Sequence, residues 1–480
     1  MSIVTTNNEN YLNIANAIRQ KNKLQTTYKP SEMPSAILNL ECNVLKDINF
    51  FNFDGKLLFS YTFSEIASLN ALPTPTNPDG LIFQQWNYTL DELKSMSTYT
   101  EVGATYITDD NSTRVYIKIL DNNQENTNVP SRSNITLYIQ QNISNGIEIN
   151  WGDNTEVQTI EGTGAVSTSH YYSAAGEYVI SLSSVDNCTL SFGNLEGTKN
   201  IFGDPNTLDI SYANMITKIE IGNNVKTIGY KSLSYCYSLE YITIPNNVTT
   251  ISTGAFMHDY ALKAVVLPYN NTSIGNNSFS YCYGLKKVIL PKNTTTFGSS
   301  SFSYCTTLNT INIPYNTTII TDNLFSNCYL LSFINIPSTV TEIKNNAFYY
   351  CYNLKNIVIP NSVSSIGDSS FGYCYSLCSV NMSNSIDTIS GYAFYYCYSL
   401  TSVTIGSSIE TIGNNAFGFC KSIKEYHFSS ETPPVLQGSS VFNQIALDCI
   451  IYVPANSVDL YKQDTNWTVV ADYIQGDTAL

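Results

Sequence analysis

The feature that most constrains the fold of this 480-residue chain is a cysteine that recurs every 23 residues through its second half. Eight of the twelve cysteines lie in this register, and Asp259 stands at the one step where the cysteine is missing. The register cysteines are Cys236, Cys282, Cys305, Cys328, Cys351, Cys374, Cys397 and Cys420. A fixed period of this length is typical of a solenoid, in which each repeat forms one coil that stacks on its neighbours.

Each repeat follows the pattern F-x-x-C-x-x-L-x-x-V-x-I-P-x-x-V-x-x-I-G-x-x-A. The V-x-I alternation, as at Ile357 and Ile359, predicts a short strand with two side chains directed inward. The proline that follows, such as Pro360, ends the strand because it cannot donate to the ladder. The F-x-x-C-x-x-L stretch has a period of three, which predicts a tight helical or 3₁₀ turn.

Tyrosines flank the register cysteine in most repeats, so stacked coils are expected to arrange them in two columns. The column one residue before the cysteine contains Tyr235, Tyr281, Tyr304, Tyr350, Tyr373 and Tyr396. The column one residue after it contains Tyr237, Tyr260, Tyr283, Tyr329, Tyr352, Tyr375 and Tyr398. We favour a structural ladder on the convex flank, in which the rings of adjacent coils stack on one another. The alternative is an adhesive platform for sugar rings or partner chains.

The cysteine shares the inward row with the phenylalanine and the leucine of its repeat, as Cys397 does with Phe394 and Leu400. Equivalent cysteines of adjacent coils project in parallel, and disulfide geometry resists that arrangement. A straight row also cannot form a tetrahedral zinc cage, and the chain has no C-x-x-C pair. We therefore expect buried free thiols, and neither a metal nor a cofactor.

The outward positions of the strands form the concave sheet of the expected solenoid, and they are the candidate ligand-binding residues. Most are small, neutral hydrogen-bonding groups with an occasional aromatic ring, which suits a neutral glycan or another polar surface. The candidates are Tyr241, Thr243, Thr310, Asn312, Phe333, Asn335, Asn356, Asn381 and Thr404.

The repeat pattern resembles the BspA-like leucine-rich repeats over residues 215–428. The resemblance implies a solenoid over residues 201–430 in a mainly β, multidomain chain. Residues 450–474 break the period, and they resemble the unit that closes many such arrays. We therefore expect a C-terminal cap over residues 431–480.

The first 120 residues resemble modules found in tail proteins of phages that infect Gram-positive bacteria. The resemblance rests on the I-A-x-A-I-R-x-K and Y-x-P-S-E-M motifs near the N-terminus and on the block D-G-L-I-F-Q-Q-W-N-Y-T-L-D-E-L. It implies a helical virion-docking module over residues 1–43 and an α+β spacer domain over residues 44–120. Within the spacer we expect a hairpin at Asp54-Gly55, a helix capped by Thr89 and a second hairpin with its turn at Asp109–Ser112.

Residues 121–200 are similar to a PKD-type Ig-like domain. The similarity rests on the W-G-D-N turn, the later H-Y-Y run and the G-E-Y-V-I strand. It implies a β-sandwich in which Asp153 holds a turn and His170 packs rather than catalyses. The stretch D-N-N-Q-E-N before it lacks the glycine and glutamate of a calcium loop, so we interpret it as a linker.

Composition and charge exclude several classes of partner. The formal net charge of −15 repels phosphate backbones, so nucleic acid is not an expected partner. No apolar run is long enough to span a bilayer, and the N-terminus shows no signal peptide, so synthesis in a cytoplasm without export is expected.

No sequence motif indicates catalysis, and we expect no catalytic residue and no enzyme. The three histidines are dispersed, and the chain has no G-x-S-x-G, H-E-x-x-H or P-loop motif. A carboxylate pair of the kind that glycosidases use could still form in space.

The leading hypothesis is therefore a phage tail or tail-fibre protein, located in the virion tail, that recognises its receptor through the solenoid. Its expected partners are other tail or baseplate proteins, bound by the N-terminal module, and a host-surface glycan, wall polymer or protein. The alternative is a BspA-like adhesin on a bacterial cell surface, and a third hypothesis is a tail-associated glycan hydrolase. Homo-oligomerisation stays open, because no heptad pattern predicts it.

Overall fold

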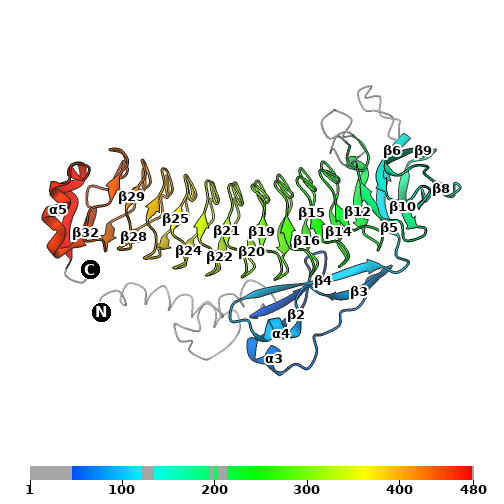
Figure 1. The fold of residues 1–480 in the computed structure, drawn as a ribbon, viewed down its shortest axis with the longest axis horizontal. Helices are drawn as coiled ribbons and strands as arrows, with labels where there is room; N and C mark the ends of the chain where they lie inside the picture. The colour runs from blue at the N-terminus through cyan, green and yellow to red at the C-terminus, as the bar shows by residue number, and fades with distance from the viewer. Residues whose placement is uncertain (1–45, 121–133, 194–198, 204–212, 478–480) are drawn as a thin grey trace, which may run out of the picture.

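The computed structural model describes residues 46–120, 134–193, 199–203 and 213–477. The expected N-terminal module over residues 1–43, with its helices, and the expected linker at residues 121–126 lie outside these residues. The predicted mainly β fold with a C-terminal solenoid is confirmed. Figure 1 shows the solenoid as a long stack of coils, with two smaller β domains gathered around its N-terminal end.

Each solenoid coil contributes one strand to a first side of the stack, where the strands fall into three successive sheets. These strands pair in parallel and in register, for example Asn356 with Ser379 and Val358 with Asn381. They are β12 (Ile216–Glu220), β14 (Tyr241–Thr243), β16 (Ala264–Val266), β18 (Lys287–Ile289), β20 (Thr310–Asn312), β22 (Phe333–Asn335), β24 (Asn356–Val358), β26 (Ser379–Asn381), β28 (Ser402–Ile405), β30 (Glu425–Phe428), β32 (Ile450–Pro454) and β33 (Ile474–Asp477).

A second side of the stack is formed by strands of two residues, each ending in an inward apolar side chain. A pair such as Thr388 and Ile389 is enough to continue the ladder, because it pairs in parallel with the equivalent residues of both neighbouring coils while Ile389 is buried in the core. These strands are β13 (Thr227–Ile228), β15 (Thr250–Ile251), β17 (Ser273–Ile274), β19 (Thr296–Phe297), β21 (Ile319–Ile320), β23 (Glu342–Ile343), β25 (Ser365–Ile366), β27 (Thr388–Ile389), β29 (Thr411–Ile412) and β31 (Val435–Leu436).

The turn that carries the cysteine is tight, but the predicted helical or 3₁₀ turn is wrong. In one coil the Cys282 N–H donates to the Phe279 carbonyl at 3.2 Å, which closes a four-residue turn. Tyr281, the third residue of that turn, has φ of 63°, so the chain cannot continue as a right-handed helix. Its N–H instead donates to the Ser303 carbonyl of the next coil at 2.8 Å. The turn therefore extends the inter-coil ladder.

The cysteine column lies in the core beside a column of stacked phenylalanines. The Cys351 Sγ lies 3.2 Å from the Phe325 carbonyl of the preceding coil, and every later register cysteine repeats this contact. The register cysteines are buried free thiols. Burial raises the pKa of the Cys351 thiol well above its ordinary value. Each cysteine thus supplies a small apolar volume and a weak donor to an adjacent carbonyl.

Both ends of the solenoid are covered. At the C-terminal end, η4 (Ala455–Ser457), α5 (Val458–Gln463) and η5 (Thr468–Tyr473) fold over the last coils and bury Tyr461 and Trp467. At the N-terminal end, β5 (Thr113–Ile119) pairs antiparallel with β12. Capping of both ends removes the exposed sheet edge that an open solenoid would present.

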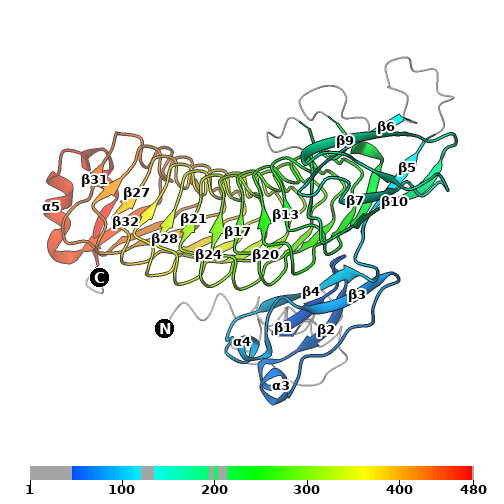
Figure 2. The same cartoon turned by 45° about the vertical axis from the view of Figure 1, so that its right-hand side comes forward.

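The strand β5 belongs to a two-sheet β-sandwich that shares one hydrophobic core with the solenoid. One sheet continues from β12 through β5 to β10 (Gly176–Ser184), β7 (Ile147–Asn150) and β8 (Gln158–Thr159). The other contains β11 (Leu190–Phe192), β6 (Asn134–Gln141) and β9 (Gly164–Tyr171). η3 (Ala213–Met215) leads from the sandwich into β12. The sandwich and the solenoid are therefore joined through one continuous sheet (Figure 2).

Within the sandwich, His170 packs on the core and pairs with Asp153. Its ring stacks on Trp151 at a centroid distance of 4.7 Å, and its Nε2 lies 2.7 Å from Asp153 Oδ2. Burial alone would raise the pKa of Asp153, but hydrogen bonds from Thr155 and His170 outweigh it and lower this pKa. The pair fixes the turn before β8.

Residues 46–108 form a four-stranded sheet with its own core, in the order β2-β1-β4-β3. The strands are β1 (Ile48–Phe51), β2 (Leu57–Tyr61), β3 (Leu81–Trp86) and β4 (Thr100–Thr108), with helices α3 (Phe63–Ser68) and α4 (Leu90–Lys94). The predicted hairpin at Asp54-Gly55 and the Thr89-capped helix are confirmed. We call residues 46–108 the docked domain, because this sheet lies beside the first solenoid coils (Figures 1 and 2).

The predicted second hairpin is wrong. The turn at Asp109–Ser112 is present, but β4 pairs with β1 and β3, whereas β5 pairs with β10 and β12. Local turn chemistry marks where the chain reverses, and the non-local partners decide to which sheet each strand belongs.

Candidate binding surface of the solenoid

The outward side chains on this first side of the stack form two columns, because each three-residue strand directs its middle residue into the core and the other two away from it. In β22, β24 and β26 the middle residue is buried and both neighbours are exposed. Register pairing sets Thr310 beside Phe333 and Asn312 beside Asn335. The structure thus aligns the candidate residues of successive coils along one face.

The docked domain covers the N-terminal part of this face. Val266 and Ile289, the outward side chains of β16 and β18, pack against Phe51 and Leu57. The approach is so close that a Cβ at Gly103 would meet Val266 Cγ1 at 2.2 Å, so only glycine fits there.

Two of the residues predicted to bind ligand lie at this covered end. Thr243 is only 1% exposed, and its hydroxyl accepts the Ile221 N–H. Tyr241 is half-buried and holds Lys263 over its ring. Thr243 cannot reach a ligand on this face, and Tyr241 stands at its edge. The covering of this part of the face was not predicted from the sequence, although the outward Ala264, Val266 and Ile289 of the neighbouring coils are apolar and could have indicated it.

The remaining candidates lie on the free part of the face, from β20 to β28, which we call the free strand face. Phe333 is 58% exposed and Val358 is 61% exposed, and they sit diagonally on adjacent strands. Around them Asn335, Asn381 and Thr404 are exposed, and Thr310 and Asn312 are half-buried. The Asn356 Oδ1 accepts the Ser379 hydroxyl at 2.7 Å, which holds that amide in place. The surface offers neutral donors and acceptors around two apolar side chains.

Carboxylates are scarce on this face. Among the outward positions of β14 to β30, all within the described residues, only Glu425 is acidic. A glycosidase needs two carboxyl groups across the scissile bond. The hydrolase hypothesis therefore has no pair of candidate residues on this face. Elsewhere in the described ranges, no three potential metal ligands cluster.

The tyrosine columns run along the turn side of the coils, and their rings stack face to face. Tyr352 stacks on Tyr329 at 4.9 Å and on Tyr375 at 5.0 Å, and each column is broken once, at Thr306 and at Asn327. Tyr237, Tyr260, Tyr283 and Tyr398 belong to the same column as Tyr352, one residue after the cysteine. Because the ring faces contact one another, the columns present mainly ring edges and hydroxyls to a partner. Stacking of sugar rings needs free faces, so the free strand face is the better candidate.

Comparisons with known proteins agree with this architecture. Residues 210–332 and 318–448 match the family model described as BspA type leucine rich repeat region. No curated protein matches the chain. Among the described residues no helix has the length and apolar character to cross a membrane.

Solved structures are similar to part of the chain. A leucine rich cell surface protein from Faecalibacterium prausnitzii is 23% identical, with 54% of this chain and 84% of that chain covered and a TM-score of 0.35. A leucine-rich repeat protein from Bacteroides ovatus is 23% identical, with 55% and 85% covered and a TM-score of 0.32. The pneumococcal vaccine antigen PcpA is 19% identical, with 54% and 86% covered and a TM-score of 0.29.

Proposed function

The repeat region of this chain, residues 210–448, belongs to the BspA type leucine-rich repeat family, and on that premise we propose that the protein is a recognition protein that adheres to a surface through its solenoid. The contact is made by the free strand face, and its ligand is a neutral glycan or wall polymer. The observation that carries this proposal is the set of exposed neutral side chains, held in register across β20 to β28, around Phe333 and Val358.

The chemistry of this face supports a neutral polymer rather than a charged ligand. Amides and hydroxyls at Asn335, Asn356, Asn381 and Thr404 can exchange hydrogen bonds with sugar hydroxyls. Phe333 can pack against the apolar face of a sugar ring. The repeat of the coils matches a ligand that is itself repetitive, because each coil presents two outward side chains, most of them neutral and polar, about 5 Å further along.

We place the protein in the tail of a phage, as a receptor-binding component. Support comes from the sequence of residues 11–120, which resembles modules of phage tail proteins. In this proposal the N-terminal segment binds other tail or baseplate proteins and the solenoid meets the host surface. The second candidate is a bacterial cell-surface adhesin, which the repeat family alone would suit.

Immunogold electron microscopy of the producing culture, before and after prophage induction, separates the two locations. The antibody is raised against residues 215–480. Gold at the distal ends of tails is expected for the receptor-binding protein. Gold on cell walls in the absence of particles would refute the virion proposal and favour the adhesin.

A matched pair of variants tests the free strand face itself. Val358→Asp places a charge in the centre of the face, and Val435→Asp places the same charge at a valine 55% exposed on β31, on the other side of the coil. We expect at least tenfold weaker binding of the purified chain to host cells for Val358→Asp and no change for Val435→Asp. Equal binding of both variants would refute this face as the contact.

A further inference from the structure

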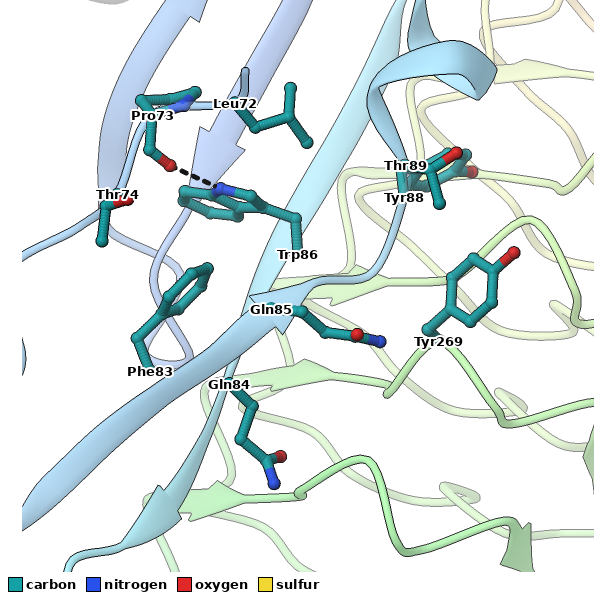
Figure 3. A pocket seen from close by; sticks show the side chains of 10 residues that line it. All are labelled: Leu72, Pro73, Thr74, Phe83, Gln84, Gln85, Trp86, Tyr88, Thr89 and Tyr269. Carbon is teal, nitrogen blue, oxygen red and sulfur yellow. Dashed lines mark hydrogen bonds between the residues drawn. The ribbon is translucent and has the colours of Figure 1, made fainter.

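We propose that the seam between the docked domain and the solenoid holds a second binding site, a pocket for a single neutral pyranose ring. The pocket has a volume of about 300 Å³ and is lined by Phe83, Gln84, Gln85, Trp86 and Tyr88 of the docked domain together with Tyr269 of the solenoid. Figure 3 shows Trp86 and Phe83 on one side, Tyr269 on the other, and the two glutamines between them. This size is at the lower end of small-molecule sites.

The aromatic side of the pocket is rigid. The Trp86 Nε1–H donates to the Pro73 carbonyl at 2.7 Å, and the residue is only 4% exposed, so the indole forms the buried base of this side of the pocket. Phe83 packs edge-on against Trp86 at a centroid distance of 5.3 Å and remains half-exposed. Rings fixed before binding lose little conformational freedom when a ligand packs on them.

The polar groups of the pocket are available for hydrogen bonds. The exposed amide of Gln85 has no hydrogen-bond partner within the described part of the chain. The Gln84 Oε1 accepts the Asn246 N–H at 2.9 Å, which anchors that side chain to the solenoid and leaves its NH₂ group to donate. The Tyr269 hydroxyl is 3.3 Å from Glu92 Oε1, so its oxygen can still accept.

Three properties of the lining point to a neutral sugar. Aromatic rings favour the apolar face of a pyranose, and adjacent amides match its equatorial hydroxyls. The pocket walls carry no charged side chain, so an ionic ligand would lose its hydration without gaining a counter-charge. Glu92, which accepts the Tyr269 hydroxyl and lies 3.7 Å from Lys292 Nζ, does not line the pocket.

The site needs both parts of the chain. Tyr269 follows the proline that ends β16, whereas the other lining residues belong to the docked domain. Tyr315 occupies the equivalent position two coils further along, where no domain docks, and it is 58% exposed. Docking therefore converts a repeated surface tyrosine into one wall of a pocket. The inference does not depend on the free strand face, which lies on later coils.

Saturation-transfer NMR and calorimetry with the full chain test the pocket. The probes are glucose, galactose, N-acetylglucosamine and their short β-linked oligomers. We expect at least one of them to bind, with affinity reduced tenfold or more by Tyr269→Ala and severalfold by Gln85→Ala. The matched control Tyr315→Ala removes an equivalent tyrosine outside the pocket and should bind as the wild type does.

The outcomes separate this proposal from its alternatives. Absence of binding by every probe, or equal binding by Tyr269→Ala and Tyr315→Ala, would overturn it. Binding of an aromatic peptide in the absence of sugar binding would also overturn it, in favour of a protein ligand. Val358→Asp should leave sugar binding at the pocket unchanged, so failure of the free strand face and failure of the pocket are distinguishable. Equal melting temperatures of the two tyrosine variants verify that both are folded.

Discussion

Lys287 of β18 and Glu101 of β4 lie 186 residues apart in the sequence and form a salt bridge of 2.6 Å across the seam between the solenoid and the docked domain. The carboxylate is 3% exposed and the lysine is 19% exposed. The Lys287 Nζ also lies 4.1 Å from the centroid of the Phe51 ring. A buried ion pair of this kind fixes how two surfaces meet, because either charge is costly without the other.

The first prediction concerns this pair. Lys287→Met leaves the buried Glu101 carboxylate without a counter-charge, although the Tyr99 hydroxyl still donates to it at 3.0 Å. We therefore expect a loss of about 3–5 kcal/mol in the free energy of unfolding of the docked domain or of its attachment. Urea denaturation and limited proteolysis between residues 46 and 120 measure it. The control is Lys263→Met, since the Lys263–Glu240 pair is 44% and 45% exposed and is expected to contribute less than about 1 kcal/mol. Equal losses in the two variants would contradict the assigned role.

The second prediction concerns Asp259, which replaces a cysteine in the buried column. Its Oδ1 accepts the Cys236 N–H at 2.9 Å, and its Oδ2 is buried and unpaired among the described residues. Burial raises the pKa of Asp259 well above its ordinary value. Asp259→Cys restores the repeat and removes this buried acid, so we expect a gain on the order of 1–3 kcal/mol at pH 7.

The same substitution changes the pH dependence of stability. Because the pKa of Asp259 is raised in the folded state, the folded chain holds a proton that the unfolded chain releases above about pH 4. Stability therefore falls as pH rises from that value to the folded-state pKa, by at most about 1.4 kcal/mol per pH unit. Urea unfolding between pH 5 and 8 should show a shallower fall for Asp259→Cys. Asp368→Asn, at an exposed aspartate, should leave the slope as it is.

The third prediction concerns thiol reactivity. The register cysteines are buried, whereas Cys378 is exposed. Burial raises the pKa of thiols such as Cys305 and Cys351, so little thiolate is present at neutral pH. In a Cys42→Ser background we expect one fast-reacting thiol with Ellman's reagent, and none after Cys378→Ser. Rapid labelling of several further cysteines in the folded chain would contradict the buried column.

The fourth prediction concerns the break in the tyrosine column at Thr306. Tyr283 and Tyr329 flank it one coil to either side. Thr306→Tyr completes the column with two new ring contacts, and we expect a gain of about 1–2 kcal/mol in the free energy of unfolding. Thr306→Leu adds apolar volume without a ring and should gain less. If the two variants melt at the same temperature, stacking does not stabilise the ladder.

Much of the solenoid follows from local periodicity. The Cys351–Cys374–Cys397 spacing sets the coil length, and the alternation around Ile357 sets which side chains enter the core. These patterns are predictive because each coil contacts mainly its neighbours, so the environment of one repeat is supplied by copies of itself. The positive φ of Tyr281 could not be predicted from the pattern. A period of three fits a 3₁₀ turn, and it fits equally well a series of separate four-residue turns, each closed by its own hydrogen bond.

The sequence by itself determined the repeat, its strands, its buried cysteine column and the neutral character of the strand face. Only the tertiary structure decided that β4 and β5 join different sheets, that the docked domain covers Val266 and Ile289, and that Tyr269 faces Trp86 and Gln85 across a seam. The physical reason is range. Packing within the solenoid depends on residues one coil apart in the sequence, so the repeat pattern predicts it. Contact between the docked domain and the solenoid depends on residues more than a hundred positions apart, and no local sequence pattern predicts how those two surfaces fit together.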